Sequence, residues 1–157
     1  MPWWLVPTTA DFGMRVAAET MEQMFAEAAK GMQDLVLSRD AAKASLSLPR
    51  EGDVWRVPAT PLDLERSLVR WLDELIYQAE GEGRWLVDAE VAIDHEAVHA
   101  VVEWVDAESV LRDVEIKATT RHELGITTLQ ADEISPSVGE APQLNGPLVV
   151  AHVVFDI

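Results

Sequence analysis

The spacing of apolar residues changes once along the chain, and this change constrains the fold more than any other feature. Between residues 20 and 37 apolar side chains recur every three or four positions, and the same spacing returns between residues 61 and 80. Such spacing predicts two amphipathic helices. After Arg84 the pattern alternates, as in Val98, Ala100 and Val102, which predicts strands. Helices early and strands late, with no regular βαβ alternation, predict an α+β fold of mainly antiparallel sheet and two helices.

Local signals place the ends of these elements. Thr20 and Gln23 form a capping box for the first helix, and Thr60 followed by Pro61 predicts the start of the second, which Gly81 ends. Asp94 to Ala97 resemble a tight turn between two alternating segments. The remaining pattern predicts strands at 3–6, 12–18, 54–57, 98–104, 114–118 and 148–157, a loop over 41–52 and a turn-rich loop over 132–147.

Length and composition favour one soluble domain. The chain has 157 residues, of which 48% are hydrophobic, enough for one core and too few for two ordinary domains, so we expect a single domain over 1–157. It contains no cysteine, which excludes disulfides and thiolate metal sites. The N-terminal segment lacks a signal-peptide pattern, and no apolar run reaches the roughly 18 residues of a membrane span. We therefore expect a cytoplasmic protein without a membrane partner.

The charge is strongly acidic. Twelve Lys and Arg stand against 28 Asp and Glu, giving a net charge of −16. Direct nucleic-acid binding depends on basic residues that displace counterions from phosphates, so this charge argues against it. The acidity fits solubility, a cation site or a basic protein partner.

His95, Glu96 and His99 match the H-E-x-x-H pattern. On a helix the two histidines share one face and can hold zinc while the glutamate acts as a general base, which would make a zinc hydrolase. On strands the histidines would instead stand roughly 13 Å apart and could not share one ion. The surrounding Val and Ile favour strands, so the hydrolase remains the less favoured alternative.

The end of the chain carries a second candidate site. Asp156 follows an apolar strand, and its carboxylate with an oxygen of Ile157 would suit a hard cation if another acid joined them. A solvated strand end explains the same residues without any ligand. Lys117, in the strand predicted over 114–118, is by pattern alone a solvated side chain.

Several short motifs, taken together in their order and spacing, resemble the archease family. These are Thr9-Ala10-Asp11-Phe12-Gly13, Met24-Phe25, Ala28-Ala29, Leu72-Asp73-Glu74-Leu75-Ile76-Tyr77, Lys117-Ala118-Thr119-Thr120 and Phe155-Asp156-Ile157.

The resemblance implies a role as well as an α+β fold. Archeases are accessory proteins of RtcB-type RNA ligases, which join RNA fragments in tRNA splicing and RNA repair. By this resemblance the protein would promote guanylylation and multiple turnover of such a ligase and would catalyse no reaction itself. Asp11, Lys117 and Asp156 match the family's functional positions and would be the ligase-activating residues.

The resemblance also implies a metal site, formed by Asp11, Asp156 and Ile157. Oxygen ligands without cysteine or a well-placed histidine suit calcium, or less well magnesium, and not zinc.

Two positions depart from the family pattern: Thr8 stands where the first motif begins with histidine, and Arg121 where an aromatic residue is usual. A protein that kept the fold without a ligase role is therefore a further alternative.

Overall fold

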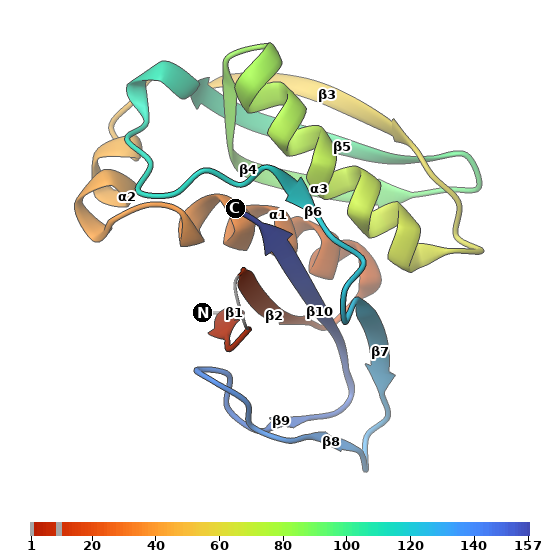
Figure 1. Cartoon of the computed structure of the whole chain (residues 1–157). Coiled ribbons are helices and arrows are strands. Elements are labelled where there is room, and N and C mark those ends of the chain that lie inside the picture. The colour runs from red at the N-terminus through yellow and green to blue at the C-terminus, as the bar shows by residue number, and fades with distance from the viewer. Residues whose placement is uncertain (1, 9–10) are drawn as a thin grey trace.

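The computed structural model describes residues 2–8 and 11–157. Thr9 and Ala10, which belong to the first family-like motif, lie outside the described residues. In the described residues the fold consists of a five-stranded and a three-stranded antiparallel sheet, a small two-stranded sheet and three helices, so the α+β prediction is confirmed. Figure 1 shows the three-stranded sheet above, the five-stranded sheet below, and α1 between them.

The five-stranded sheet has β10 at its centre. Strands β1 (Trp3–Val6), β2 (Phe12–Ala18), β10 (Leu148–Asp156) and β6 (Ala118–Thr119) follow one another, and β7 (Gly125–Leu129) also pairs with β10. Val149, Ala151, Val153 and Phe155 point from β10 into the main core. The alternation of this strand therefore places its other residues, including His152, on the opposite face.

The three-stranded sheet has β5 (Ala97–Asp106) between β3 (Glu51–Pro58) and β4 (Arg84–Ile93). Its inner face contributes Trp55, Val98 and Ala100 to the same core that β10 enters. One hydrophobic core is therefore shared by both sheets and by the helices between them.

Two long helices fill the space between the sheets. Helix α1 (Met21–Leu35) begins after Thr20, whose hydroxyl accepts from the Gln23 amide, as the capping box predicts. Helix α3 (Leu64–Gly81) carries Trp71, which is fully buried and donates its ring N–H to the Phe25 carbonyl oxygen at 2.9 Å. This bond satisfies the indole nitrogen inside the core and fixes α3 against α1.

Some boundaries predicted from the sequence were wrong. The second helix begins after Asp63, not Thr60, because the Asp63 carboxylate accepts from the Arg66 amide. Residues 41–52 are not simply a loop: helix α2 (Arg39–Ser45) begins after Ser38, which caps the Ala41 amide. This helix is too short to show an apolar period, which explains why the sequence did not reveal it.

The strands also differ in places. The strand expected over 114–118 is reduced to β6, and β7 was not predicted. Strand β3 begins three residues before Val54. The loop over 132–147 contains β8 (Ile134–Ser135) and β9 (Leu144–Asn145), which pair with each other, and the 3₁₀ turn η1 (Ala107–Ser109) follows β5.

None of the helices in the described ranges combines the length and the low polarity that crossing a membrane requires.

Candidate functional site

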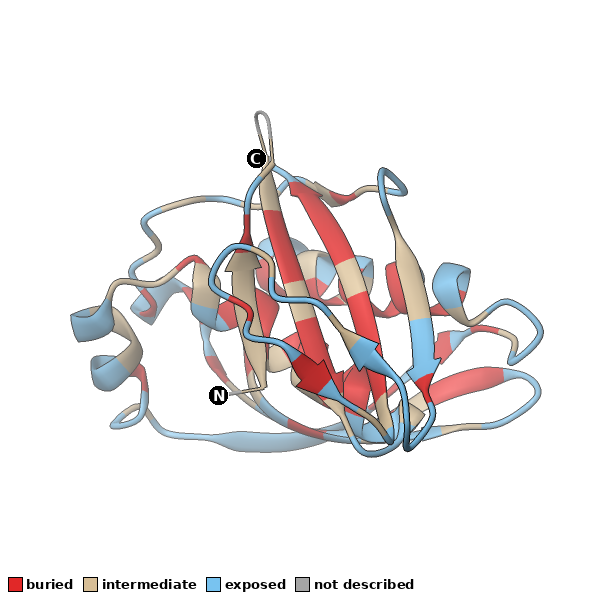
Figure 2. Ribbon diagram, turned by 90° about the horizontal axis from the view of Figure 1, so that it is seen from below, coloured by how far each residue is buried: buried red, intermediate tan, exposed pale blue. Residues whose placement is uncertain are grey.

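The predicted site residues from the two ends of the chain lie at one end of the five-stranded sheet. The antiparallel register of β2 and β10 ends with the pair Phe12 and Phe155. Directly beyond this pair, Asp11 precedes β2 and Asp156 is the last residue of β10. In Figure 2 the C-terminus lies at the top of the view, at the end of the strands of this sheet. The fold therefore brings these two acids to the same end of two adjacent strands.

Strand β6 brings Lys117 to the same place from the other side of β10. Ala118 pairs with Asp156, and the Lys117 amide donates to the Asp156 carbonyl oxygen at 2.8 Å. The Lys117 side chain is exposed. Lys117, Asp156 and Asp11 thus occupy three neighbouring strand ends, and we call these residues, with Ile157, the strand-end cluster.

The chain before β2 is shaped by Thr8. Its hydroxyl donates to the Asp11 carbonyl oxygen at 2.6 Å and accepts from the Asp11 amide at 3.0 Å. Gly13 permits Thr8 and Val6 to approach closely, because a Cβ atom there would lie 2.6 Å from the Thr8 methyl carbon and 2.7 Å from Val6. Thr8, one of the two departures from the family pattern, therefore has a structural role in holding Asp11.

Asp73 of α3 belongs to one of the family-like motifs, and the sequence did not predict a role for it. Its carboxylate accepts from the Thr119 amide at 3.0 Å, which ties β6 to the helix two residues after Lys117. Thr120 anchors the other end of β6, since its amide and its hydroxyl both donate to the Val154 carbonyl oxygen. The sequence could not predict the contact of Asp73 with Thr119, because an acidic residue on the exposed side of an amphipathic helix is expected to face solvent.

The donor set of the strand-end cluster consists of oxygen atoms. The main-chain oxygens of Asp11 and Asp156 already accept hydrogen bonds, whereas their carboxylates make no ion pair with any described residue. Among residues 2–8 and 11–157, no three His, Asp or Glu side chains gather closely enough to hold a metal ion. Two carboxylates fit a hard cation such as calcium only if main-chain oxygens, Ile157 among them, complete the shell.

The hydrolase alternative is wrong because the H-E-x-x-H segment is a hairpin. His95 and Glu96 lie in the exposed turn between β4 and β5, and His99 lies on β5. The Asp94 carboxylate accepts from the Glu96 and Ala97 amides at 2.8 and 2.9 Å, and its second oxygen lies 2.7 Å from His99 Nε2. These backbone hydrogen bonds, and then His99, lower the pKa of Asp94 to about 2. The segment therefore supports a turn and lacks the helical spacing of a zinc site.

Another charged group lies on the outer face of the five-stranded sheet. His152 pairs with Arg15 across the sheet, and its Nε2 lies 3.6 Å from a Glu123 carboxylate oxygen. Burial, and then the charge of Arg15, lower the pKa of His152. The imidazole is therefore held neutral, and it lies in the middle of β10, away from the strand-end cluster.

Comparison with known proteins agrees with this fold. The Archease protein family (MTH1598/TM1083) matches residues 3–157. A protein named archease from Methanopyrus kandleri is 36% identical over 91 residues, a match that spans 58% of this chain and 60% of that protein's length. The solution structure of Methanobacterium thermoautotrophicum protein 1598 covers 99% of both chains with a TM-score of 0.59 at 20% identity, which supports the fold. The match over residues 3–157, on a fold that aligns along nearly its whole length, shows that this chain belongs to the archease family.

Proposed function

We propose that this protein is an accessory factor that promotes guanylylation and multiple turnover of an RtcB-type RNA ligase. The observation that carries the proposal is the strand-end cluster: Asp11, Lys117 and Asp156, the three positions that match the family's functional residues, lie on three neighbouring strand ends. Membership of the archease family supports an accessory role, and the net charge of −16 suits a partner that itself carries basic residues for RNA.

The chemistry of the cluster suits a reaction between phosphates. The Lys117 ammonium is a compact charge that can approach phosphate oxygens, and the two carboxylates can hold a divalent cation with the Ile157 main-chain oxygen. Calcium is favoured over magnesium, because Ca²⁺ accepts irregular shells of carboxylate and carbonyl oxygens. When bound, the cation would supply positive charge beside the ligase. The chain's own contribution is to fix the positions of these side chains through β2, β6 and β10.

The test is ligase guanylylation by an RtcB-type enzyme from the same source, with the protein present or absent and with calcium added or chelated. Asp156→Asn and Asp11→Asn remove one negative charge each at nearly constant volume, and Lys117→Met keeps most of the side-chain length. We expect each variant to lower the stimulated rate about tenfold or more, equivalent to ~1.4 kcal/mol, without lowering thermal stability.

Asp132→Asn is the matched control. This exposed aspartate follows β7, which pairs with the beginning of β10, so it lies at the opposite end of the same sheet. It should stimulate the ligase as the wild type does. Full stimulation by all three cluster variants would remove the cluster from the mechanism, and a wild-type protein without any effect on a competent ligase would favour an archease fold without a ligase role.

A further inference from the structure

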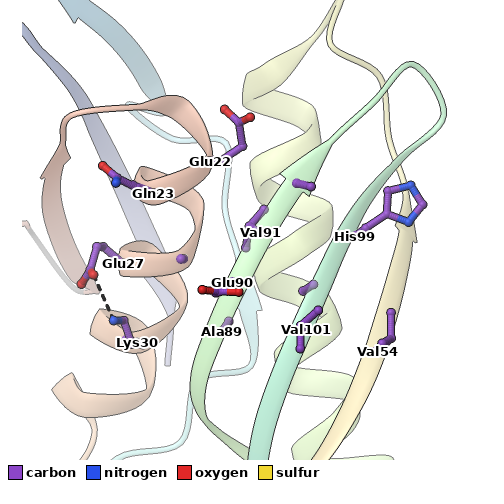
Figure 3. Close-up of a pocket in the computed structure, with 13 residues that line it drawn as sticks. Glu22, Gln23, Glu27, Lys30, Val54, Ala89, Glu90, Val91, His99 and Val101 are labelled. Atoms are coloured by element: carbon purple, nitrogen blue, oxygen red, sulfur yellow. Dashed lines mark ion pairs between the residues drawn. The ribbon is translucent and has the colours of Figure 1, made fainter.

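A groove lies along the three-stranded sheet, where α1 runs beside the edge strand β4, and it is lined by residues of α1, β4, β5 and β3. Its volume is about 480 Å³. Figure 3 shows Glu22, Gln23, Glu27 and Lys30 along α1, facing Glu90 and Val91 of β4, with His99, Val101 and Val54 on the neighbouring strands. We call this feature the helix–sheet groove.

Two valines form an exposed apolar surface in this groove. Val54 and Val101 are directly paired across β3 and β5, and they are 62% and 60% exposed. The small side chain of Ala92 is also exposed on this face. Exposed β-branched residues paired between an edge strand and the central strand form a small apolar patch, and apolar patches with a polar rim mark interaction surfaces.

The rim of the groove is acidic. Glu90 pairs in register with Val101, so its carboxylate is next to the apolar patch, and Glu22 lies across the groove at the start of α1. Neither acid forms an ion pair with a described residue. Lys30, the one lysine of the groove, is engaged by Glu27 at 2.9 Å and by Asp88 at 3.7 Å. The groove therefore offers two uncompensated carboxylates beside an apolar surface.

The acidic rim and the apolar patch together limit what kind of molecule can bind in the groove. Nucleic acid and anionic lipid would be repelled by Glu22 and Glu90, and a second copy of a chain with net charge −16 would meet the same repulsion. A polypeptide segment that combines Lys or Arg with aliphatic side chains is complementary in both respects. Its basic side chains can place their methylene stems on Val54 and Val101 and their charges at the two glutamates.

We infer that the helix–sheet groove docks a basic, aliphatic segment of the ligase that the protein assists, an inference that rests on the proposed function. An RNA ligase must carry lysines and arginines to hold its substrate, so it is a partner with the required charge. The groove and the strand-end cluster lie on different sheets. Docking in the groove would therefore set affinity, while the cluster sets the rate of guanylylation in the bound complex.

The test measures the dissociation constant of the full-length ligase and this protein by isothermal titration calorimetry, together with guanylylation. One variant, Val101→Glu, places a charge in the apolar patch, and a second, Glu22→Lys with Glu90→Lys, reverses the rim. At exposed positions outside the groove, Leu111→Glu introduces one charge as Val101→Glu does, and Asp132→Lys reverses one acid as each rim substitution does; Leu111 is 78% exposed.

We expect both groove variants to raise the dissociation constant about tenfold or more, while both controls stay within about twofold. Stimulation should return when the groove variants are supplied at saturating concentration, because the strand-end cluster is intact. Raising the salt from about 50 to about 300 mM should weaken wild-type binding more than binding of the rim-reversed variant.

The outcomes separate the docking inference from the proposed function. If the wild type binds and stimulates while both groove variants bind equally well, docking in the groove is overturned and the ligase role stands. If the wild type binds and the groove variants do not, but the wild type does not accelerate guanylylation of the ligase, docking stands and the proposed function fails. If the wild type does not bind the ligase at all, both are overturned.

Discussion

The two sheets bury their inner faces in one shared core, but their outer faces differ. On the five-stranded sheet, Ala17 and Val150 are covered by Leu144 of the segment between β7 and β10, with Leu129 beside them. Arg15 on the same face donates to the Ser135 hydroxyl at 3.0 Å and to the Pro136 carbonyl oxygen at 2.9 Å. This sheet is thus closed on its outer side by the chain itself.

No segment of the described chain covers the three-stranded sheet in this way. Val101 occupies the centre of its outer face much as Val150 does on the other sheet, yet Val101 is 60% exposed and Val150 only 7%. Figure 2 shows the five-stranded sheet from its outer side, with buried residues along its central strands. The comparison teaches that valines at equivalent places on two sheets can have different environments: Val150 is buried and contributes to folding, whereas Val101 stays exposed.

The largest expected effect contrasts these two valines. Val150→Glu would bury an unpaired carboxylate and should lower the free energy of unfolding by about 3 kcal/mol or more. Val101→Glu makes the same change on the open face and should cost about 1 kcal/mol or less, mainly through lost strand propensity. Urea unfolding followed by tryptophan fluorescence measures both. Equal losses would mean that both outer faces are buried.

A smaller effect tests the covering segment. Leu144→Ala should lower the free energy of unfolding by about 2–3 kcal/mol, because Leu144 is 8% exposed and packs on Ala17 and Val150. Ile134→Ala in the same segment should cost about 0.5 kcal/mol or less, since Ile134 is 56% exposed. Thermal unfolding of the two variants compares them directly. A loss at Ile134 as large as that at Leu144 would show that the segment does not pack as described.

The next effect uses pH to probe the covered face. Because the pKa of His152 is lowered in the folded protein, the unfolded chain binds a proton more readily than the folded one. The stability that the neutral imidazole contributes is complete above the ordinary pKa of 6.5 and decreases as the pH falls below it. The free energy of unfolding should therefore decrease between pH 7 and pH 5. His152→Gln should flatten that profile, and an unchanged profile would mean that another group titrates.

The smallest effect is at the hairpin of the open sheet. The pKa of Asp94 is lowered from 3.8 to about 2, so its contribution is present above pH 4 and is lost as the pH falls towards 2. Asp94→Asn should lower the melting temperature less than Leu144→Ala does, because the turn is exposed. It should also remove part of the decrease in melting temperature between pH 4 and pH 2. A melting profile identical to that of the wild type over this range would contradict the assigned turn contacts.

Much of the fold could be predicted from local sequence. The periodic apolar residues of α1 and α3 and the alternation of β5 and β10 are repeated signals, and these elements were found where expected. The turn at 94–97 was also confirmed, because Asp94 bonds the amides of the turn that it starts. The short strands β1 and β2 were also predicted with their observed bounds. By contrast, β6 was misplaced and α2 was missed, because these segments are too short to show a period.

For the candidate site, the sequence predicted which residues would take part but not the contacts that hold them in place. The resemblance to archeases selected Asp11, Lys117, Asp156 and Ile157, but no sequence signal placed Asp73 against the Thr119 amide. That bond depends on how α3 packs over β6, which is a long-range contact. The role of Thr8 in holding the Asp11 backbone was likewise visible only from its hydrogen bonds to Asp11.

The sequence by itself determined the class of the fold, the long elements and the acidic character, because periodicity and charge are properties of neighbouring residues. The tertiary structure decided which strand ends meet, since the pairing of β10 with both β2 and β6 joins residues from opposite ends of the chain. It also decided that one apolar sheet face is covered and the other exposed. Valine has the same side chain on both faces, and only the path of the remaining chain determines whether water reaches it.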